Sequence, residues 1–355
     1  MAINKKRIVG AFMMGRIIKV GVVGLGIMGR THTRAYKRYP NVEVVAVCDI
    51  DRSRAESFAK EFSVKKVYTD FWKMAEDPEI EAVSVTTPDF LHKDPVIAFA
   101  ENGKHVLCEK PLATSVKDAE EMVRTCEKSN VKLMVAFHNR WSPPYAILKS
   151  RADSGELGDP VYAYMRLCDT LYVPTKMLSW ASKSAVIWFL GSHIVDLVRW
   201  IFGKEAVKVY CLKGDRILKN IGVDTEDFFC YLVEFQDNVV AMFENSWILP
   251  ETMPSIVDFS SKFVFSKGCV YIDTHHHRVM DVYTASKAEK PSLFAGPIEI
   301  HGRLMGFNVS TVWHFVDCLI EDKTPLSTGY DGLAVTKIIE AALNSAAQGK
   351  PVNIT

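Results

Sequence analysis

Three glycines near the N-terminus have the spacing of a turn that binds phosphate. Gly24, Gly26 and Gly29 follow an apolar, strand-like run and lead into a stretch with helical periodicity. Glycine lets such a turn close tightly and lets its backbone approach a pyrophosphate group. The N–H groups of Ile27 and Met28 would then point at the phosphates, aided by the helix dipole. In this context the pattern predicts a dinucleotide-binding site.

An acidic residue lies where a dinucleotide site needs one. Asp49 ends the second apolar run, about 20 residues after Gly29, and its carboxylate can accept hydrogen bonds from ribose hydroxyls. Its charge would repel the 2′-phosphate of NADP, so the sequence favours NAD. Arg52 and Arg54 follow closely and could hold a phosphate, which leaves NADP as the less favoured alternative. A glycine-rich turn beside an unrelated surface aspartate is the simpler explanation. Four matching features weigh against it: the preceding strand, the glycine spacing, the following helix and the position of the acid.

A lysine follows another predicted strand at the same edge of the sheet. Thr87 and Pro88 end one apolar run, and Glu109 and Lys110 end the next. Ligands of open α/β sheets bind outside the carboxyl ends of the strands, so Lys110 should point toward the nicotinamide half of the cofactor. Partial burial beside a positive ring would lower the pKa of Lys110 and suit it to exchange a proton with a hydroxyl. A surface lysine after an edge strand is equally consistent with its position alone.

The elements that would position these groups alternate along the N-terminal part of the chain. Nearly continuous apolar runs predict buried parallel strands, and helical periodicity fills the intervals between them. Strands are expected at 17–23, 42–48, 80–86, 104–108 and 131–137. Helices are expected at 28–38, 51–62, 90–101 and 115–128. This alternation predicts an α/β fold whose N-terminal Rossmann domain is a doubly wound parallel sheet.

The pattern changes after residue 138. Further helices are expected at 143–153, 192–202, 309–321 and 331–348, and strand-like runs fill most of the interval from 161 to about 283. Ser142 should cap the first of these helices, with Pro143 in its first turn, and Gln236 and Asp237 predict a hairpin. Consecutive strands without helices between them predict an α+β domain with a mainly antiparallel sheet.

These observations divide the chain into three parts. Residues 1–15 are interpreted as a leader, because their basic and apolar stretches are too short for a signal peptide. Residues 16–138 form the expected dinucleotide-binding domain. Residues 139–355 form the expected domain for substrate binding and oligomerisation.

The composition excludes several classes of protein. Hydrophobic residues are 48% and charged residues 24% of the 355, which is typical of a globular chain and not of a disordered one. Lys plus Arg is 43 and Asp plus Glu is 42, a balance that indicates neither a nucleic-acid nor a membrane-surface partner. No apolar run approaches the ~18 residues of a transmembrane helix. The eight cysteines form no CxxC pair, and we interpret them as reduced thiols of a cytoplasmic protein.

The motifs together resemble those of the Gfo/Idh/MocA oxidoreductases. The matching segments are GVVGLGIMGRTH at 21–32, AVSVTTPDFLH at 82–92, HVLCEKPLA at 105–113 and GSHIVDLVRW at 191–200, and the resemblance extends over about 16–355. It implies a Rossmann domain followed by a second domain built on a large open sheet. It also implies oxidation or reduction of sugars, inositols and their derivatives with NAD or NADP, in a homodimer or homotetramer.

The resemblance also assigns roles to particular residues. Lys110 corresponds to the catalytic lysine of the family, His193 to its catalytic histidine, and Asp196 to the acid one helical turn later. We expect His193 to accept the hydroxyl proton, Asp196 to orient its ring, and Lys110 to bind the same oxygen and relay the proton. Ser192 should cap the helix that carries His193. The cofactor contacts expected in all are Gly24, Gly26, Ile27, Met28, Gly29, Asp49, Arg54, Thr87, Pro88, His92, Glu109, Lys110 and Asn139.

One position departs from the family pattern. Dehydrogenases of the family commonly have Asp four residues before the histidine, and this chain has Phe189 there. The chain loses one acceptor for substrate hydroxyls and one partner for Lys110; Asp169, Lys183 or Arg166 could replace it. The departure leaves two alternatives open, an NAD-dependent glycosidase that uses the cofactor transiently and a non-catalytic nucleotide-sensing relative.

Three consecutive histidines are the other chemical signal. His275 and His277 would share a face of a strand on either side of His276 and could form half of a metal site. The sequence offers no third ligand at a telling spacing, so we predict no metal ion and interpret the histidines as a solvated turn or a substrate contact.

Overall fold

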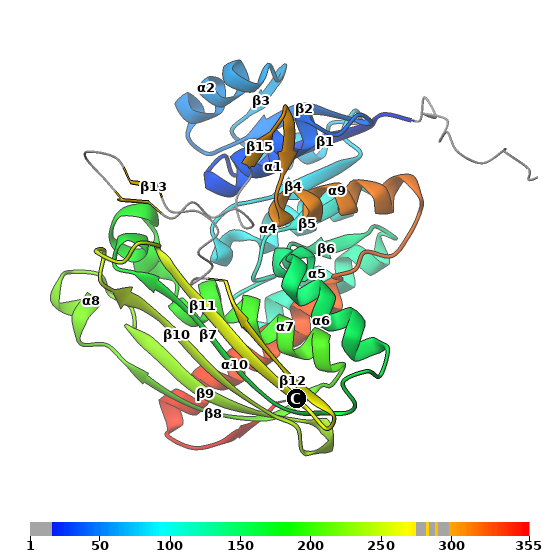
Figure 1. The fold of residues 1–355 in the computed structure, drawn as a ribbon. Coiled ribbons are helices and arrows are strands. Elements are labelled where there is room, and N and C mark those ends of the chain that lie inside the picture. The colour runs from blue at the N-terminus through cyan, green and yellow to red at the C-terminus, as the bar shows by residue number, and fades with distance from the viewer. Residues whose placement is uncertain (1–15, 275–281, 284–287, 290–297, 355) are drawn as a thin grey trace, which may run out of the picture.

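A computed structural model describes residues 16–274, 282–283, 288–289 and 298–354 of this chain (Figure 1). Its N-terminal part is a six-stranded sheet with the strand order β3-β2-β1-β4-β5-β6, and each of its strand pairs is parallel. The strands are β1 Ile18–Val23, β2 Val42–Cys48, β3 Lys66–Tyr68, β4 Ala82–Val85, β5 His105–Cys108 and β6 Leu133–Val135. The helices are α1 Ile27–Lys37, α2 Arg52–Phe62, α3 Phe71–Ala75, α4 Lys93–Glu101 and α5 Val116–Lys128. The predicted Rossmann fold is therefore confirmed.

A second sheet follows, with seven strands in the order β12-β11-β7-β10-β9-β8-β17. Its pairs are antiparallel except β7 with β10, so the predicted mainly antiparallel sheet is confirmed. Its strands are β7 Pro160–Thr170, β8 Ala206–Gly214, β9 Phe228–Phe235, β10 Val240–Leu249, β11 Val257–Phe265, β12 Gly268–Asp273 and β17 Val352–Asn353. The helices of this half are α6 Pro143–Asp153, α7 Ser192–Phe202, α8 Ile217–Asn220, α9 Phe307–Ile320 and α10 Gly329–Gln348. Two short pairs, β13 Val282–Tyr283 with β14 Ala288–Glu289 and β15 Ile298–Ile300 with β16 Arg303–Met305, lie between β12 and α9.

Helices cover one face of the second sheet, as Figure 1 shows for α7 and α10. The side chains of β9 alternate between buried and exposed, as they should when one face is packed and the other is open. The turn at Gln236–Asn238, with Asp237 at φ 60°, joins β9 to β10 and confirms the predicted hairpin. Neither of the predicted serine caps forms. Ser142 precedes α6 without a capping hydrogen bond, and Ser192 continues a π-helical segment, Ile187–Gly191, where the chain is already helical.

The C-terminal helices return to the parallel sheet. Val309, Val312 and Phe315 of α9 are fully buried in a core that they share with β1 and α1. Trp313 donates a hydrogen bond from Nε1 to the carbonyl of Ala35 at 2.8 Å. Helix α10 packs against α5 and β6 as well as β8, so it contacts both sheets. We propose a domain boundary near residue 138, after the last parallel strand, with α9 added to the N-terminal core.

Candidate functional site

The glycine turn between β1 and α1 is tightly packed on one side and open on the other. A Cβ on Gly24, whose φ is +86°, would lie 2.7 Å from the backbone of Thr86, and one on Gly29 would collide with the carbonyl oxygen of Gly24. No atom lies within 4 Å of a Cβ built on Gly26, which faces open space. This cradle beside the start of α1, where Ile27 and Met28 lie, fits a pyrophosphate group.

Asp49 lies beside the turn, at the end of β2. Its carboxylate accepts hydrogen bonds from the backbone N–H groups of Leu25 and Asp51, each at 3.0 Å. Arg54 lies 3.3 Å from this carboxylate and 3.7 Å from that of Asp51, so its charge is already paired. Asp49 retains acceptor positions for a ribose, whereas a 2′-phosphate would have to compete for Arg54. Exposed Arg52 pairs with Glu56 at 2.9 Å.

The loops after β4 and β5 are tied together by a histidine. One ring nitrogen of His92 lies 3.0 Å from the carbonyl oxygen of Thr87, and the other lies 2.8 Å from that of Pro111. His92 is 1% exposed and follows Pro88 by one short 3₁₀ turn. His92 was predicted to contact the cofactor. In the structure, its ring supports the two loops that carry Thr87 and Lys110.

Glu109 also supports the site from behind. Its carboxylate lies 3.0 Å from the Nε2 atom of His32 on α1 and accepts a hydrogen bond from the backbone N–H of Lys110 at 3.2 Å. Burial alone would raise the pKa of Glu109, but the hydrogen bond with His32 lowers it to about 2. The ionised carboxylate fixes the backbone of Lys110. This role accounts for an acidic residue directly before the lysine, without any contact between Glu109 and the cofactor.

Lys110 reaches from the parallel sheet to the second half of the molecule. Its Nζ donates a hydrogen bond to the backbone carbonyl of Phe189 at 2.8 Å and lies 4.3 Å from the centre of the Phe189 ring. Burial lowers the pKa of Lys110, and the nearby carboxylates Glu109, Asp89 and Asp169 partly oppose that effect. A lysine with a lowered pKa can exchange a proton near neutral pH more readily than an exposed one.

His193 lies on α7 and within electrostatic reach of Lys110. Burial and the positive charge of Lys110 lower the pKa of His193 well below 6.5, so the ring is neutral at pH 7. Its Nδ1 has no hydrogen-bond partner in the described part of the chain. The ring of His138 lies 4.6 Å away, centre to centre, and packs in turn on Phe307 at 5.2 Å. A neutral imidazole with a nitrogen available is what a general base requires.

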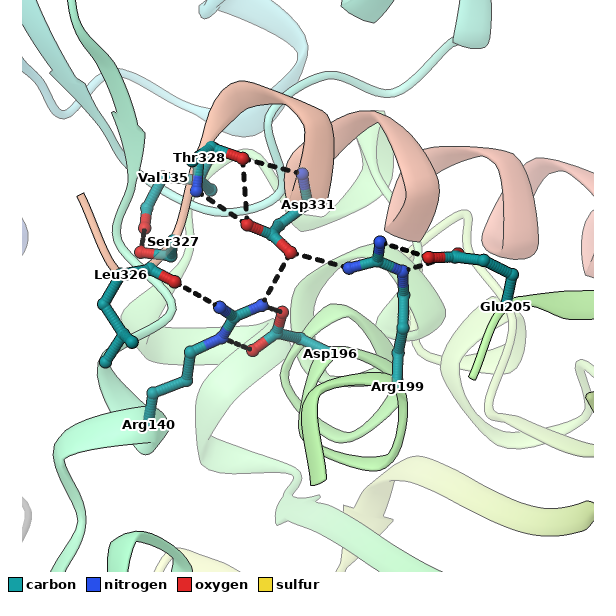
Figure 2. Close-up of polar contacts among 9 residues, drawn as sticks. All are labelled: Val135, Arg140, Asp196, Arg199, Glu205, Leu326, Ser327, Thr328 and Asp331. Atoms are coloured by element: carbon teal, nitrogen blue, oxygen red, sulfur yellow. Dashed lines mark hydrogen bonds and ion pairs between the residues drawn. The ribbon is translucent and has the colours of Figure 1, made fainter. Parts of the chain in front are cut away.

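Asp196 does not orient His193, and that prediction is wrong. Asp196 is held by Arg140, whose Nε and Nη2 donate to its two carboxylate oxygens at 2.9 and 2.5 Å (Figure 2). Both side chains are almost fully buried, and Arg140 comes directly after Asn139, which is also buried. A bidentate guanidinium occupies both carboxylate oxygens, so Asp196 anchors α7, and the Nδ1 of His193 has no hydrogen bond from it in the described residues.

The anchor extends to the start of α10. Asp331 lies 3.1 Å from Arg140 and 2.6 Å from Arg199, and it forms a capping box with Thr328 (Figure 2). The Nη1 of Arg140 donates to the carbonyl of Leu326 at 2.6 Å. The network joins α7, α10 and the segment after β6, and so fixes the position of His193. Sequence reasoning missed Arg140, although it follows the predicted contact Asn139.

The structure thus brings together only part of the predicted site. The glycine turn and Asp49 form one end, and Lys110 and His193 form the other. The histidines 275–277 lie outside the described residues, and within the described ranges no group of three or more His, Cys, Asp or Glu residues could hold a metal ion. The same part of the chain contains no helix long and apolar enough to cross a membrane.

Comparisons with known proteins match both halves of the chain. Residues 18–137 match the family model GFO_IDH_MocA, described as an oxidoreductase family with an NAD-binding Rossmann fold, and residues 145–270 match the GFO/IDH/MocA C-terminal domain. The chain is 29% identical over 342 residues to a scyllo-inositol 2-dehydrogenase (NAD(+)) of Bacillus subtilis, covering 95% of this chain and 96% of that protein. It is 25% identical to a D-apiose dehydrogenase of Paraburkholderia graminis, covering 95% and 89%. A crystal structure of scyllo-inositol dehydrogenase from Lactobacillus casei with bound NAD(H) and scyllo-inositol has the same fold, with a TM-score of 0.80, 20% identity, and coverage of 96% and 99%.

Proposed function

This chain belongs to the Gfo/Idh/MocA family of NAD-binding oxidoreductases, and from that premise we propose that it transfers a hydride between a secondary alcohol of a sugar or cyclitol and NAD. The observation that carries the proposal is the pair of Lys110, which follows β5 in the sheet that bears the glycine turn, and neutral His193 on α7. The inositol and apiose dehydrogenases to which the chain is similar support this substrate class.

The residues divide the chemistry between them. The glycine turn and Asp49 would hold NAD, which when bound would supply the hydride acceptor of the reaction. His193 accepts the proton of the substrate hydroxyl on its neutral imidazole, because burial and Lys110 keep that ring uncharged. The ammonium group of Lys110 donates a hydrogen bond to the same oxygen and stabilises the negative charge that develops there. The anchor through Asp196 and Arg140 holds His193 in place while the proton moves.

Reduced-nicotinamide absorbance tests the proposal. Purified protein is mixed with NAD, then NADP, and a panel of inositols, hexoses, hexonic acids and anhydrosugars. We expect NADH to form with at least one polyol, and Lys110→Ala to lower kcat by roughly 100-fold or more. Lys183→Ala, which removes an exposed lysine, is the matched control and should keep normal turnover. Lys110→Ala that retains most of its turnover would show the assignment to be wrong.

A second candidate function follows from Phe189. The Phe189 side chain offers no carboxylate, and Lys110 donates a hydrogen bond to its backbone carbonyl. An NAD-dependent glycosidase, which oxidises and re-reduces its substrate in one cycle, is consistent with that change. Release of a sugar from a glycoside without net formation of NADH would favour this reading over the dehydrogenase.

We also propose that the chain forms a homodimer or homotetramer through the open face of the second sheet. A row of paired residues crosses that face, Tyr271, Lys262, Tyr164, Met242, Leu232 and Tyr210 on β12, β11, β7, β10, β9 and β8. Five of the six are large apolar or aromatic side chains, and Tyr271 is 69% exposed. Contiguous apolar surface of this kind is typical of an interface.

The eight cysteines are free thiols, which supports a cytoplasmic location.

A further inference from the structure

A row of buried polar side chains runs behind Lys110, from α1 through β4 to the end of β5. Tyr36 and His32 lie one helical turn apart on α1. The Tyr36 hydroxyl lies 2.7 Å from the Oγ of Ser84 on β4, which lies 3.0 Å from the Nδ1 of His32. The Nε2 of His32 lies 3.0 Å from Glu109, which accepts the backbone N–H of Lys110. The row therefore connects the helix that begins at the glycine turn to the lysine of the proposed reaction.

The row lies out of reach of water. Tyr36 and Ser84 have no exposed surface, His32 is 1% exposed and Glu109 is 4% exposed. Polar side chains in such a place cost free energy unless each of them is hydrogen-bonded. All four are bonded here, and a complete buried network fixes the position of its members.

The hydrogens of the row point in one direction. Glu109 is an anion and can only accept, so the Nε2 of His32 carries a hydrogen. Burial raises the pKa of Tyr36, so its hydroxyl keeps its hydrogen, and Ser84 is its partner among the described residues. With a neutral imidazole, Tyr36 donates to Ser84, and Ser84 donates to the Nδ1 of His32. Every hydrogen then has an acceptor, whereas a hydrogen on Nδ1 would leave one hydroxyl of the row without an acceptor.

The row holds a negative charge beside Lys110. Burial favours the neutral acid of Glu109, and the hydrogen bond from His32 is the largest effect that opposes it. Glu109 in turn does more than any other nearby carboxylate to help Lys110 keep its proton. His32 therefore acts on the charge of Lys110 through Glu109.

The surroundings leave this effect to Glu109. The other titratable groups near Glu109 and Lys110 are Asp89 after β4, Cys108 on β5, His138 after β6, Asp169 on β7 and His193 on α7. Burial lowers the pKa of both imidazoles and raises the pKa of the thiol, so these three groups are uncharged at pH 7. The two aspartates act on Lys110 in the same direction as Glu109, but more weakly.

We propose that His32 is a positioning residue of the reaction: its hydrogen bond, backed by Ser84 and Tyr36, holds Glu109 as an anion beside Lys110 and so keeps the lysine protonated. The inference rests on the proposed function, in which the ammonium group of Lys110 binds the reacting oxygen. Without the bond from His32, burial would favour the neutral acid of Glu109, and Lys110 would lose its proton at a lower pH.

The pH profile of kcat/KM tests the inference, with NAD and scyllo-inositol or the polyol of the panel that is turned over fastest. The value should fall at high pH as Lys110 loses its proton, and His32→Leu should move this fall to lower pH by about one pH unit or more. His32→Gln keeps an N–H group for Glu109 and should restore most of the profile. His105→Leu removes a half-buried histidine at the opposite end of β5 and should leave the profile unchanged.

A second substitution shows whether His32 acts through Glu109. Glu109→Gln replaces the charge by an amide of the same size and should move the profile as His32→Leu does. The double variant should move it no further, because both changes remove the same effect. A further shift in the double variant would overturn the inference.

The direction of the row can be tested without catalysis. At about pH 8, above the ordinary range of an imidazole, ¹⁵N NMR of the wild type should show the His32 ring with its hydrogen on Nε2. The signals of this ring are those that disappear in His32→Gln. A hydrogen on Nδ1 would overturn the inference even if His32→Leu does not fold.

The outcomes separate the inference from the proposed function. A wild-type protein that turns over no polyol of the panel overturns both. An active wild type with the same profile as His32→Leu overturns the inference alone, as does an equal shift in His105→Leu. A lower kcat/KM in His32→Leu with an unshifted profile would indicate a merely structural role and also counts against the inference.

Discussion

A single residue, His138, should make the stability of the protein depend on pH. Burial lowers the pKa of His138 from 6.5 to about 4. The unfolded chain therefore binds more protons between these values, and the free energy of unfolding falls as the pH is lowered through them. This contribution amounts to roughly 2 kcal/mol between about pH 7 and about pH 5.

His138→Phe keeps an aromatic ring against Phe307 and removes the titration. Urea unfolding at about pH 7 and about pH 5 measures the effect. Between these values the free energy of unfolding should decrease by roughly 2 kcal/mol less in the variant than in the wild type. An equal decrease in both proteins would mean that His138 is protonated as easily in the folded as in the unfolded state.

Sequence reasoning at this scale named residues that the fold brings together, but not the contacts that hold them. Lys110 and His193 lie within electrostatic reach of one another, and their catalytic roles stay a prediction. The role of Asp196 was wrong because helical spacing indicates which residues share a face but not which side chain reaches that face from elsewhere. Arg140, 56 positions earlier in the chain, takes both carboxylate oxygens.

Among the elements, the glycine turn offers a sharp test of the cofactor site. Gly26 has a negative φ and open space where a Cβ would lie, so Gly26→Ala should leave urea unfolding unchanged. The added methyl group would occupy the approach to the pyrophosphate, and the Kd for NADH should rise about tenfold or more.

Gly29→Ala is the comparison for that variant. Its Cβ would meet the backbone of Gly24, so this substitution should lower stability as well as binding. NADH binding of Gly26→Ala at the wild-type Kd would place the cofactor elsewhere.

Helix α7 depends on its buried ion pair. Asp196→Ala leaves the charge of Arg140 buried without its bidentate partner, and we expect the free energy of unfolding to fall by about 3–5 kcal/mol. His193→Ala on the same helix should lower turnover with a smaller loss of stability. Urea unfolding and NADH formation, measured on both variants, distinguish these roles. An Asp196→Ala protein of full stability and no activity would restore the catalytic assignment.

Local pattern predicted the elements well where the chain is regular. Helices α6 and α7 and strand β2 have the predicted bounds, because continuous apolar runs and helical periodicity both reflect local burial. Strand β3 has only three residues, Lys66–Tyr68, and escaped notice because it is too short to show a period. The packing of α9 on α1 was also missed, since an apolar stripe indicates that a helix is buried but not against what.

For the whole molecule, the open sheet face predicts assembly. Light scattering should give a native mass that is a multiple of 39.9 kDa. Met242→Arg places a charge in the middle of the apolar row and should lower that mass toward the single chain. Ile147→Arg, at an exposed position of α6, which packs on the other face of the sheet, is the matched control and should not lower the mass. An unchanged mass in Met242→Arg would place the interface on another surface.

Helix α9 has a consequence for how such proteins can be recombined. Its buried side chains, Val309, Val312 and Phe315, complete the interior of the cofactor-binding half from a position far along the chain. A chimera joined at residue 138 would therefore pack α9 of one parent against α1 of the other. The side chains of the two helices would then not be complementary in their shared core. Exchange of cofactor-binding halves between relatives should succeed only when α9 is carried along with the first 138 residues.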